Sequence, residues 1–476
     1  MAATELWKWT AVDLAQAIRT RKVSSREATQ AIVDRMRDVN PKLNAVVQDL
    51  GDQALSRASA ADEAARRGET LGPLHGVPVT IKENVDQKGL PTVNGIAAFK
   101  DAIAKDDNPV VANWTRAGAI TIGRTNAPAF SLRWHTDNDA RGRTYNPWSR
   151  IRTPGGSSGG ASAALAVGIA PLAHGNDYGG SIRFPAYTCG LAGIRPTQGR
   201  VPAWNPGAAA ERLPTNQLMA VNGPLARTVR DVRLGLAAMT ARDARDPIWA
   251  PAPLEGPPVA KPVRVAMVVE SPGLYVHPDV AAAIRKAGKT LADAGYKVEE
   301  VQPPSIEGAS RLWQKLVFGE SRHVMRETIE KLADADARKA LSLWLEVEPD
   351  LSLKDYMLGL AEVLTHRRAW SVFMETYPLV LGPNSGDLPF EVGFDHDTAD
   401  RLRHVLRAQA LMTAVNLLGL PSVAVPVGLA AVPDSPNGLP LGVQIVGGRY
   451  REDLALDAAE IVEAVHGIET PVDPAW

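Results

Sequence analysis

A glycine- and serine-dense segment between apolar stretches constrains this chain more than any other feature. It reads Pro154-Gly-Gly-Ser157-Ser158-Gly-Gly160 and then, after apolar residues, Gly175-Asn-Asp177-Tyr178-Gly179-Gly180-Ser181-Ile-Arg183-Phe-Pro185. A flexible linker of this composition does not usually lie between segments that are buried. A phosphate-binding loop would need Gly-Lys followed by Ser or Thr, and no lysine occurs in the segment. We therefore place the segment inside a folded core.

The flanking sequence alternates between strand and helix patterns. A short buried strand is predicted over 76–82, where β-branched residues follow a Gly/Pro boundary and the strand runs out at Lys82. Further patterns predict a helix and a strand over 110–117 and 119–123, and a strand, a helix and a strand over 263–269, 279–294 and 296–301. Alternation of this kind predicts helices packed on a sheet, which is an α/β architecture.

The first 67 residues show helical patterns instead. Thr10 is placed to cap a first helix, and a second helix over 26–38 is expected to end at Asn40-Pro41. The ten N-terminal residues lack a charged leader followed by an apolar core, so we expect no export signal.

Composition and charge narrow the function classes. Hydrophobic residues make up 45% of the 476 residues and charged residues 22%, as in soluble globular proteins. The 52 Lys and Arg against 53 Asp and Glu give a net charge of -1, which argues against a nucleic-acid or anionic-membrane binder. The apolar stretches 161–173 and 408–433 are too short or too interrupted to cross a bilayer. We expect a small-molecule partner, no nucleic acid and no membrane.

The single cysteine, Cys189, excludes an intramolecular disulfide and a cysteine-based metal cage. This usage fits a reducing compartment, and we expect the cytoplasm. No metal site is expected, because the patterns His-x-x-x-His and His-Glu-x-x-His are absent. A thiol nucleophile at Cys189 is the less favoured reading, and we expect this side chain to be packed in the core.

Ser181 has the surroundings of an attacking residue in acyl transfer. Negative charge develops on the carbonyl oxygen, and consecutive backbone N–H groups reach it only where side chains leave room. The pair Gly179-Gly180 supplies that room, so the backbone of 178–181 is the expected donor set. Residues 155–159 formally match the G-x-S-x-G elbow of α/β-hydrolases, but the segment 146–154 cannot form the strand that must precede it.

A serine hydroxyl is a weak nucleophile and needs a base. Histidine is the usual base, but apart from His174 none of the nine histidines lies in either motif. Lys82 is the remaining candidate. A lone lysine at the end of a strand is more often solvated, so Lys82 alone decides nothing.

Three blocks together resemble the amidase signature family. They are Gly76-Val-Pro-Val-Thr-Ile-Lys82-Glu-Asn84, the Gly-Gly-Ser-Ser-Gly-Gly run, and Asp177-Tyr-Gly-Gly-Ser181-Ile-Arg-Phe-Pro-Ala. The intervals of 75 residues from Lys82 to Ser157 and of 24 from Ser157 to Ser181 also match that family. The resemblance implies one large domain over 1–476, with a mixed central sheet and helices on both faces. The signature core is expected to cover about 70–240, and N-terminal helices to cover 1–69. The C-terminal part, 263–476, is expected to complete the sheet and the substrate pocket.

The resemblance also implies roles for individual residues. Ser181 becomes the nucleophile, Ser157 the bridging serine after a cis peptide, and Lys82 the base that must be neutral to accept a proton. Because an exposed lysine is protonated at neutral pH, Lys82 should be buried. Tyr178, Gly179 and Gly180 are expected at the oxyanion and substrate. Ser158, Asp177 and Arg183 are expected to hold the loop in place without contacting the substrate. No cofactor is expected.

The substrate is less constrained than the chemistry. Tyr178 and Phe184 replace the Thr and Gln of glutamine-handling relatives, which predicts a more apolar pocket. Trp134 either lines an aryl or alkyl acyl site or packs in the core. The sequence resembles those of aryl acylamidases, urethane-cleaving amidases and nylon-oligomer hydrolases. We therefore expect a small amide, anilide or carbamate as the substrate. The alternative is a glutaminase-type catalytic subunit that supplies ammonia to a partner protein. A homodimer stays open.

Overall fold

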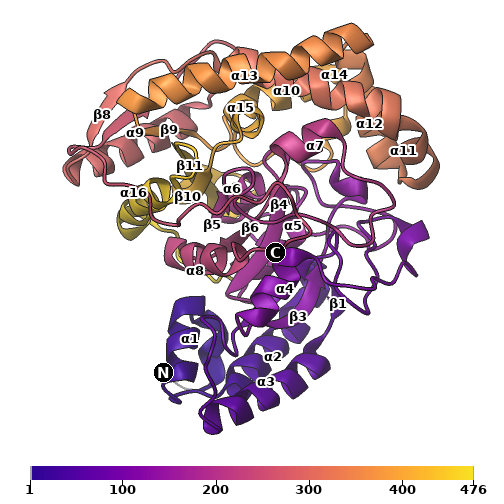
Figure 1. Ribbon diagram of the computed structural model, residues 1–476, viewed down its shortest axis with the longest axis vertical. Coiled ribbons are helices and arrows are strands. Elements are labelled where there is room, and N and C mark those ends of the chain that lie inside the picture. The colour runs from indigo at the N-terminus through magenta and orange to yellow at the C-terminus, as the bar shows by residue number, and fades with distance from the viewer. Residues whose placement is uncertain (1–2, 475) are drawn as a thin grey trace.

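One 11-stranded sheet runs through the protein, and helices lie on both of its faces (Figure 1). The computed structural model describes residues 3–474 and 476. The strands are β1 Val46–Asp49, β2 Pro78–Lys82, β3 Ile120–Thr125, β4 Leu172–Asp177, β5 Ala192–Arg195, β6 Val221–Ala226, β7 Arg264–Met267, β8 Lys297–Glu300, β9 Leu379–Pro383, β10 Ser422–Val432 and β11 Ser435–Gly447. They pair in the order β1-β3-β2-β4-β6-β5-β10-β11-β9-β7-β8.

The sheet is mixed. Strand β2 is parallel to both β3 and β4, and β7 is parallel to both β8 and β9. The strands between these two groups pair in antiparallel fashion, as does β1 with β3. Because this sheet joins strands from residue 46 to residue 447, the predicted single α/β domain with a mixed central sheet is confirmed.

Alternate residues of β2 face opposite sides of the sheet, as the period of a strand requires. Val79 and Ile81 enter one apolar core, together with buried residues of α8 (Val229–Met239) and α9 (Pro278–Asp293). Thr80 and Lys82 therefore face the other side, where α5 (Gly159–Ala166) contacts β2 and β4. This alternation places the only charged side chain of the strand over the small-residue helix α5.

The helices that cover the sheet follow the expected alternation after residue 76. Their bounds are α4 Pro109–Arg116, α5 Gly159–Ala166, α6 Arg183–Cys189, α7 Pro214–Met219, α8 Val229–Met239, α9 Pro278–Asp293, α10 Ile306–Glu320, α11 Arg326–Leu332, α12 Ala335–Val347, α13 Leu353–Thr376, α14 Ala399–Ala408, α15 Ala410–Leu418 and α16 Glu452–His466. Short 3-10 turns are η1 Ala3–Lys8, η2 Ala97–Phe99, η3 Ala129–Ser131 and η5 Phe394–His396, and η4 Ser321–Met325 is a π-helix. The proline-rich stretch 246–263 is irregular, with no helix or strand.

The N-terminal helices are α1 Ala11–Arg19, capped by Thr10, then α2 Ser25–Leu43 and α3 Gly51–Arg66. The predicted end of the second helix at Asn40-Pro41 is wrong, because α2 includes Pro41. The helix continues far enough to bury Leu43 and ends when Asn44 adopts the left-handed conformation. The expected helical segment 1–69 also contains strand β1, and residues 1 and 2 lie outside the described residues.

Within residues 3–474 and 476, no helix is both long and apolar enough to span a bilayer.

Candidate active site

The carboxyl ends of two parallel strands bring the predicted residues to one edge of the sheet. Strand β2 ends at Lys82, and the neighbouring β4 ends at Asp177. Ser157 and Ser158 precede α5, which packs on both strands, and Ser181 precedes α6. Because parallel strands end at the same side of a sheet, residues far apart in sequence meet there.

Lys82 is fully buried, as predicted, and its side chain is surrounded by hydroxyl and amide oxygens. Its Nζ lies 2.7 Å from Ser157 Oγ, 3.2 Å from Ser158 Oγ and 2.8 Å from Asn176 Oδ1. A neutral amine meets three such contacts with its two N–H groups and its lone pair, which can accept from a serine hydroxyl. Burial lowers the pKa of Lys82 well below its ordinary value, and the charge of Asp177 offsets only part of that effect. The arrangement favours a neutral lysine amine in contact with a serine hydroxyl.

The peptide bond Gly156-Ser157 is cis, which was also predicted. Thr136 holds the loop on both sides of this bond. Its Oγ1 donates to the carbonyl of Gly155 at 2.9 Å and accepts from the N–H of Gly159 at 3.1 Å. The loop is thus held from outside by Thr136, while Lys82 holds the Ser157 hydroxyl itself.

A buried ion pair organises the loop that carries Ser181. The Asp177 carboxylate accepts hydrogen bonds from the N–H groups of Gly180 and Ile182 and from the guanidinium of Arg183. Burial on its own raises the pKa of Asp177, but the charges of Arg183 and Arg195 and these hydrogen bonds hold that pKa far below its usual range. Asp177 is therefore a charged anchor of the loop.

Arg183 is in turn fixed by the C-terminal part of the chain. It donates to Asn416 Oδ1 at 2.7 Å, to Gln444 Oε1 at 2.9 Å and to the carbonyl of Met412 at 3.0 Å. These partners lie on α15 and β11, more than 200 residues away in sequence. A buried charge needs such complete hydrogen bonding to be tolerated.

Two tryptophans orient the peptides before Ser181. Trp134 Nε1 donates to the carbonyl of Gly179 at 2.9 Å, and Trp313 Nε1 donates to the carbonyl of Tyr178 at 3.0 Å. In a planar trans peptide the N–H points opposite to the C=O. The N–H of Gly179 is therefore turned away from Trp313, and among the described residues it donates to no acceptor.

Gly180 differs from the expected oxyanion donor, because its N–H already donates to Asp177 at 3.0 Å. Its φ of +102° lies in the region that favours glycine, and a Cβ there would lie 1.8 Å from the sulfur of Met412. Glycine is needed here for conformation and close packing. The N–H of Ser181, like that of Gly179, makes no hydrogen bond with a described residue.

A cavity of about 450 Å³ opens onto Ser181, Tyr178 and Gly179. Its walls are largely aromatic and aliphatic, with Phe130, Leu132, Trp134, Leu213, Trp313, Val317, Met325, Ile329 and Trp344 among them. Trp134 lies between Trp313 and Trp344, with ring centroids 6.5 and 6.3 Å away. A cavity of this size and lining suits a small molecule with an apolar or aromatic group.

A polar chain supports one wall of this cavity. The Tyr178 hydroxyl is hydrogen-bonded to Thr215 Oγ1, which in turn bonds the buried carboxylate of Glu320. Glu320 also accepts from the N–H of Thr215 at 2.9 Å and from the hydroxyl of Tyr356 on α13. The chain fixes the Tyr178 ring from α7, α10 and α13 at once.

Ser181 is partly exposed, and its Oγ forms no hydrogen bond with any described residue. The Ser157 hydroxyl is hydrogen-bonded to Lys82 but not to Ser181. Of the two links in the predicted relay, the structure therefore contains only the first. Hydrogen bonds at active sites are often long in the free enzyme and tighten when substrate binds.

Two other candidates lie in the core. Phe184 packs between Phe390 and Tyr187 and does not line the cavity at Ser181. Cys189 is fully buried, and burial raises the pKa of its thiol to about 12, which leaves it unreactive. Within the described residues no group of His, Cys, Asp and Glu is placed to hold a metal ion.

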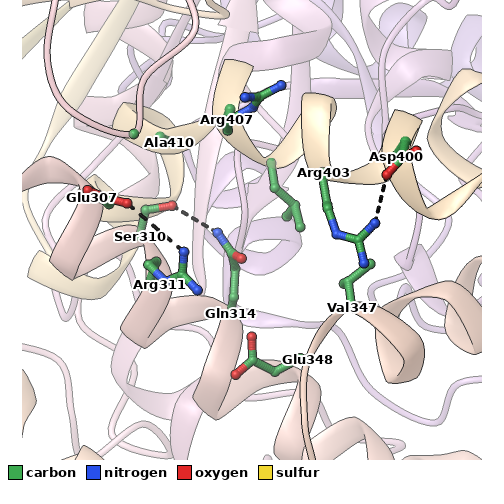
Figure 2. Close-up of a pocket in the computed structure, with 12 residues that line it drawn as sticks. Glu307, Ser310, Arg311, Gln314, Val347, Glu348, Asp400, Arg403, Arg407 and Ala410 are labelled. Carbon is green, nitrogen blue, oxygen red and sulfur yellow. Dashed lines mark hydrogen bonds and ion pairs between the residues drawn. The ribbon is translucent and has the colours of Figure 1, made fainter.

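A separate cavity of about 430 Å³ lies between α10 and α14 (Figure 2). Its charges are largely paired with each other, Arg403 with Asp400 at 2.8 Å and Arg311 with Glu307 at 4.0 Å. None of the predicted site residues lines it. Of these two cavities, the one at Ser181 combines an apolar wall with the predicted chemistry.

Comparison with known proteins decides the family. A family model described as Amidase matches residues 27–456. The chain belongs to the amidase family. It is 47% identical to indoleacetamide hydrolase of Bradyrhizobium diazoefficiens over 97% of this chain and 87% of that protein. It is also 32% identical to a glutamyl-tRNA(Gln) amidotransferase subunit of Moorella thermoacetica, over 96% of this chain and 97% of that protein.

Solved structures place this amidase-family hydrolase in the same fold. A 6-aminohexanoate cyclic dimer hydrolase complexed with substrate has a TM-score of 0.83 at 26% identity and covers 99% of both chains. A bacterial aryl acylamidase of the amidase signature enzymes has a TM-score of 0.80 at 27% identity, over 98% of this chain and 97% of the other. The resemblance inferred from the three sequence blocks is confirmed.

Sequence reasoning missed several residues that shape the site of this amidase-family member. Asn176, an acceptor for Lys82, lies in the motif segment before Asp177, and its position there could have drawn attention to it. Asn416 lies in the apolar stretch 408–433, outside the three blocks. Trp313 and Glu320 lie on α10 without a motif, and only the fold brings them to the cavity.

Proposed function

We propose that the protein hydrolyses the C–N bond of a small amide with an aryl or arylalkyl acyl group, through an acyl-enzyme on Ser181. The observation that carries this proposal is the buried Lys82 amine, 2.7 Å from the Ser157 hydroxyl, behind an aromatic cavity that opens at Ser181. The similarity to indoleacetamide hydrolase, an enzyme named for an arylacetamide, supports an aromatic acyl group.

The first half-reaction forms the acyl-enzyme. Ser181 Oγ attacks the amide carbonyl while its proton passes to Ser157 Oγ, and the Ser157 proton passes to Lys82 Nζ. The N–H groups of Gly179 and Ser181, with that of Tyr178, donate to the oxygen that becomes negative. The proton then returns from Lys82 through Ser157 to the leaving nitrogen, and the C–N bond breaks.

The second half-reaction regenerates the enzyme. A water molecule attacks the ester carbon of acyl-Ser181, and its proton passes to the same two groups. Collapse of the tetrahedral intermediate returns a proton to Ser181 Oγ and releases the carboxylic acid. Asp177 and Arg183 contact no reacting atom in this scheme and keep the loop in place. Ser158 keeps the Lys82 amine in place through its hydrogen bond to Nζ.

The alternative function is that of a glutaminase-type subunit that supplies ammonia to a partner. The experiment that separates the two functions measures acid release by the purified chain from an arylacetamide, an anilide, an aryl carbamate and glutamine, with no other protein present. We expect turnover of aryl substrates and little of glutamine. Turnover of glutamine alone, or of nothing without a partner, would overturn the proposal.

The finer assignments remain predictions. They are the preference among amide, anilide, carbamate and ester, the urethanase or aryl acylamidase character, and a cytoplasmic location. The division of the chain into a signature core at about 70–240 with flanking parts 1–69 and 263–476 is also a proposal. The substrate panel, extended by an aryl ester, addresses the first two of these, since it then contains each bond type.

A further inference from the structure

Helix α13 exposes an unusual amount of apolar surface. Of the 13 large hydrophobic side chains that are exposed among the described residues, five lie on this one helix: Leu353, Met357, Leu358, Leu364 and Val372. Their exposed fractions range from 58% to 75%. Single exposed apolar residues are ordinary, but a row of them on one element marks an interaction surface.

The row faces away from the molecule. Gly359, Val363, Trp370 and Met374 form the buried face of α13, and the helix contacts α10 and α15 beneath it. In Figure 1 the helix runs along the upper part of the protein. The outer face of α13 is exposed to solvent, and toward its C-terminal half Leu364, Arg368 and Glu375 also line a cavity that the loop 257–259 borders.

The outer face has a regular order of side chains. Residues three or four positions apart on a helix lie on the same side. Such a ridge runs along α13 and consists of Lys354, Met357, Ala361, Leu364, Arg368, Val372 and Glu375. All seven side chains are exposed. The apolar residues and Arg368 thus stand between a cation at one end of the ridge and an anion at the other.

The terminal charges of this ridge are unpaired within the described part of the chain. The ion pair on α13 joins His366 to Glu362, whereas Lys354 and Glu375 form none with any described residue. Their distance along the helix is about 32 Å at 1.5 Å per residue. A partner that satisfies both must present an anion and a cation with the same separation and the opposite order.

We propose that α13 pairs with α13 of a second copy of this chain, antiparallel, about a two-fold axis beside Leu364. This arrangement places Lys354 opposite the partner's Glu375 and Met357 opposite the partner's Val372. Each contact occurs twice, as the symmetry of such an interface requires. The ridge is complementary to itself in charge and in apolar character.

The opposite orientation does not fit. A parallel pair would set Lys354 against the partner's Lys354 and Glu375 against the partner's Glu375, and like charges repel. In the antiparallel pair, Arg368 lies opposite the partner's Ala361. The small alanine leaves room for the arginine stem, whose guanidinium reaches solvent.

The test is a measurement of mass in solution by light scattering after size exclusion, across a wide range of protein concentration. We expect a two-chain mass for the wild type and a one-chain mass for Leu364→Asp, which buries a charge beside its own copy at the axis. A wild type that stays at one-chain mass, or a Leu364→Asp variant that keeps the two-chain mass, would overturn the proposal.

Charge reversal tests the antiparallel register. Lys354→Glu alone and Glu375→Lys alone should each weaken association, because each sets like charges together, and the double variant should restore it. A double variant no better than either single one contradicts this register. Val465→Asp, at a similarly exposed valine of α16, is the matched control and should leave the mass unchanged. Binding of a one-chain wild type to phosphatidylcholine vesicles would assign the ridge to a membrane and refute the proposal.

Discussion

The Nζ atom of Lys82 lies 2.7 Å from the hydroxyl oxygen of Ser157, with both side chains buried at the carboxyl end of β2. A charged ammonium would gain little from neutral oxygens to offset the loss of water around it. The pKa of Lys82 is therefore lowered, and the lysine can act as a base at a pH where an exposed lysine cannot. The predictions below follow from this relationship and from the loop that faces it.

The lowered pKa of Lys82 makes stability depend on pH. Between the lowered folded value and the ordinary value of 10.5, the unfolded chain binds one more proton at this residue than the folded chain. Stability therefore rises with pH through that window, by about 1.4 kcal/mol per pH unit at most, and the effect ends above the ordinary value. Urea unfolding at several alkaline pH values measures it.

The reference for that measurement is Lys82→Met, which cannot titrate. The free energy of unfolding of the wild type should approach or overtake that of Lys82→Met as the pH rises from neutral. Equal pH slopes for the two proteins would mean that Lys82 keeps its ordinary pKa in the folded state, and the base would have to be sought elsewhere.

Loss of the lysine should affect amides more than esters. In Lys82→Ala the proton for the leaving nitrogen is no longer delivered through Ser157, and an alkoxide or phenoxide leaves more easily than an amine anion. We expect amide turnover to fall by about 10²–10⁴-fold, as for loss of a general acid–base group, with a smaller fall for a matched ester. Equal losses on both substrates would assign Lys82 to activation of Ser181 alone.

The glycine before Ser181 is required by its neighbours. Gly180→Ala would add a Cβ 1.8 Å from the Met412 sulfur in a backbone with φ of +102°. Gly89→Ala is the matched control, since Gly89 also has a positive φ of +81° but no atom within 4 Å of the new Cβ. The control should lose about 1–2 kcal/mol of stability from its conformation alone. Gly180→Ala should lose more stability in thermal unfolding and nearly all activity, and an effect no larger than the control's would contradict the packing argument.

The indole N–H of Trp313 should contribute to the rate in addition to the apolar surface of the ring. Trp313→Phe keeps an aromatic ring but removes the hydrogen bond to the Tyr178 carbonyl, which orients the Gly179 N–H. One such bond is worth about 0.5–1.5 kcal/mol, so kcat should fall by about 2- to 10-fold while KM changes less. Trp344→Phe trims the same kind of ring in the same cavity without touching that loop, and it should affect mainly KM. A fall of similar size in kcat for both variants would refute the orienting role.

The local parts of the site could be predicted from the sequence because their causes are local. A β-branched run ending in Lys82 predicts a buried strand end, and Gly179-Gly180 before Ser181 predicts backbone N–H donors that no side chain blocks. The first expectation is confirmed, since β2 ends at Lys82. The second is wrong for Gly180, whose N–H donates to Asp177. The burial of Lys82 could be predicted because a lysine must be uncharged to act as a base.

The long-range parts could not be predicted from local pattern. Trp313 reaches the Tyr178 carbonyl only because α10 packs against the loop, and Asn416 reaches Arg183 from α15. Pro41 was expected to end a helix, but burial of Leu43 outweighed the local preference. Phe184 was expected to shape the pocket, yet the turn of α6 directs it toward Phe390. Tertiary packing decides each of these cases.

The proposed reaction requires a covalent acyl-enzyme on Ser181. The intact mass and peptide map of the enzyme, quenched during reaction with a slowly hydrolysed aryl carbamate, test for it most directly. We expect one added carbamoyl group on the peptide that contains Ser181, and no addition to Ser181→Ala. A modification that maps to Ser157 or Cys189, or that persists in Ser181→Ala, would contradict it.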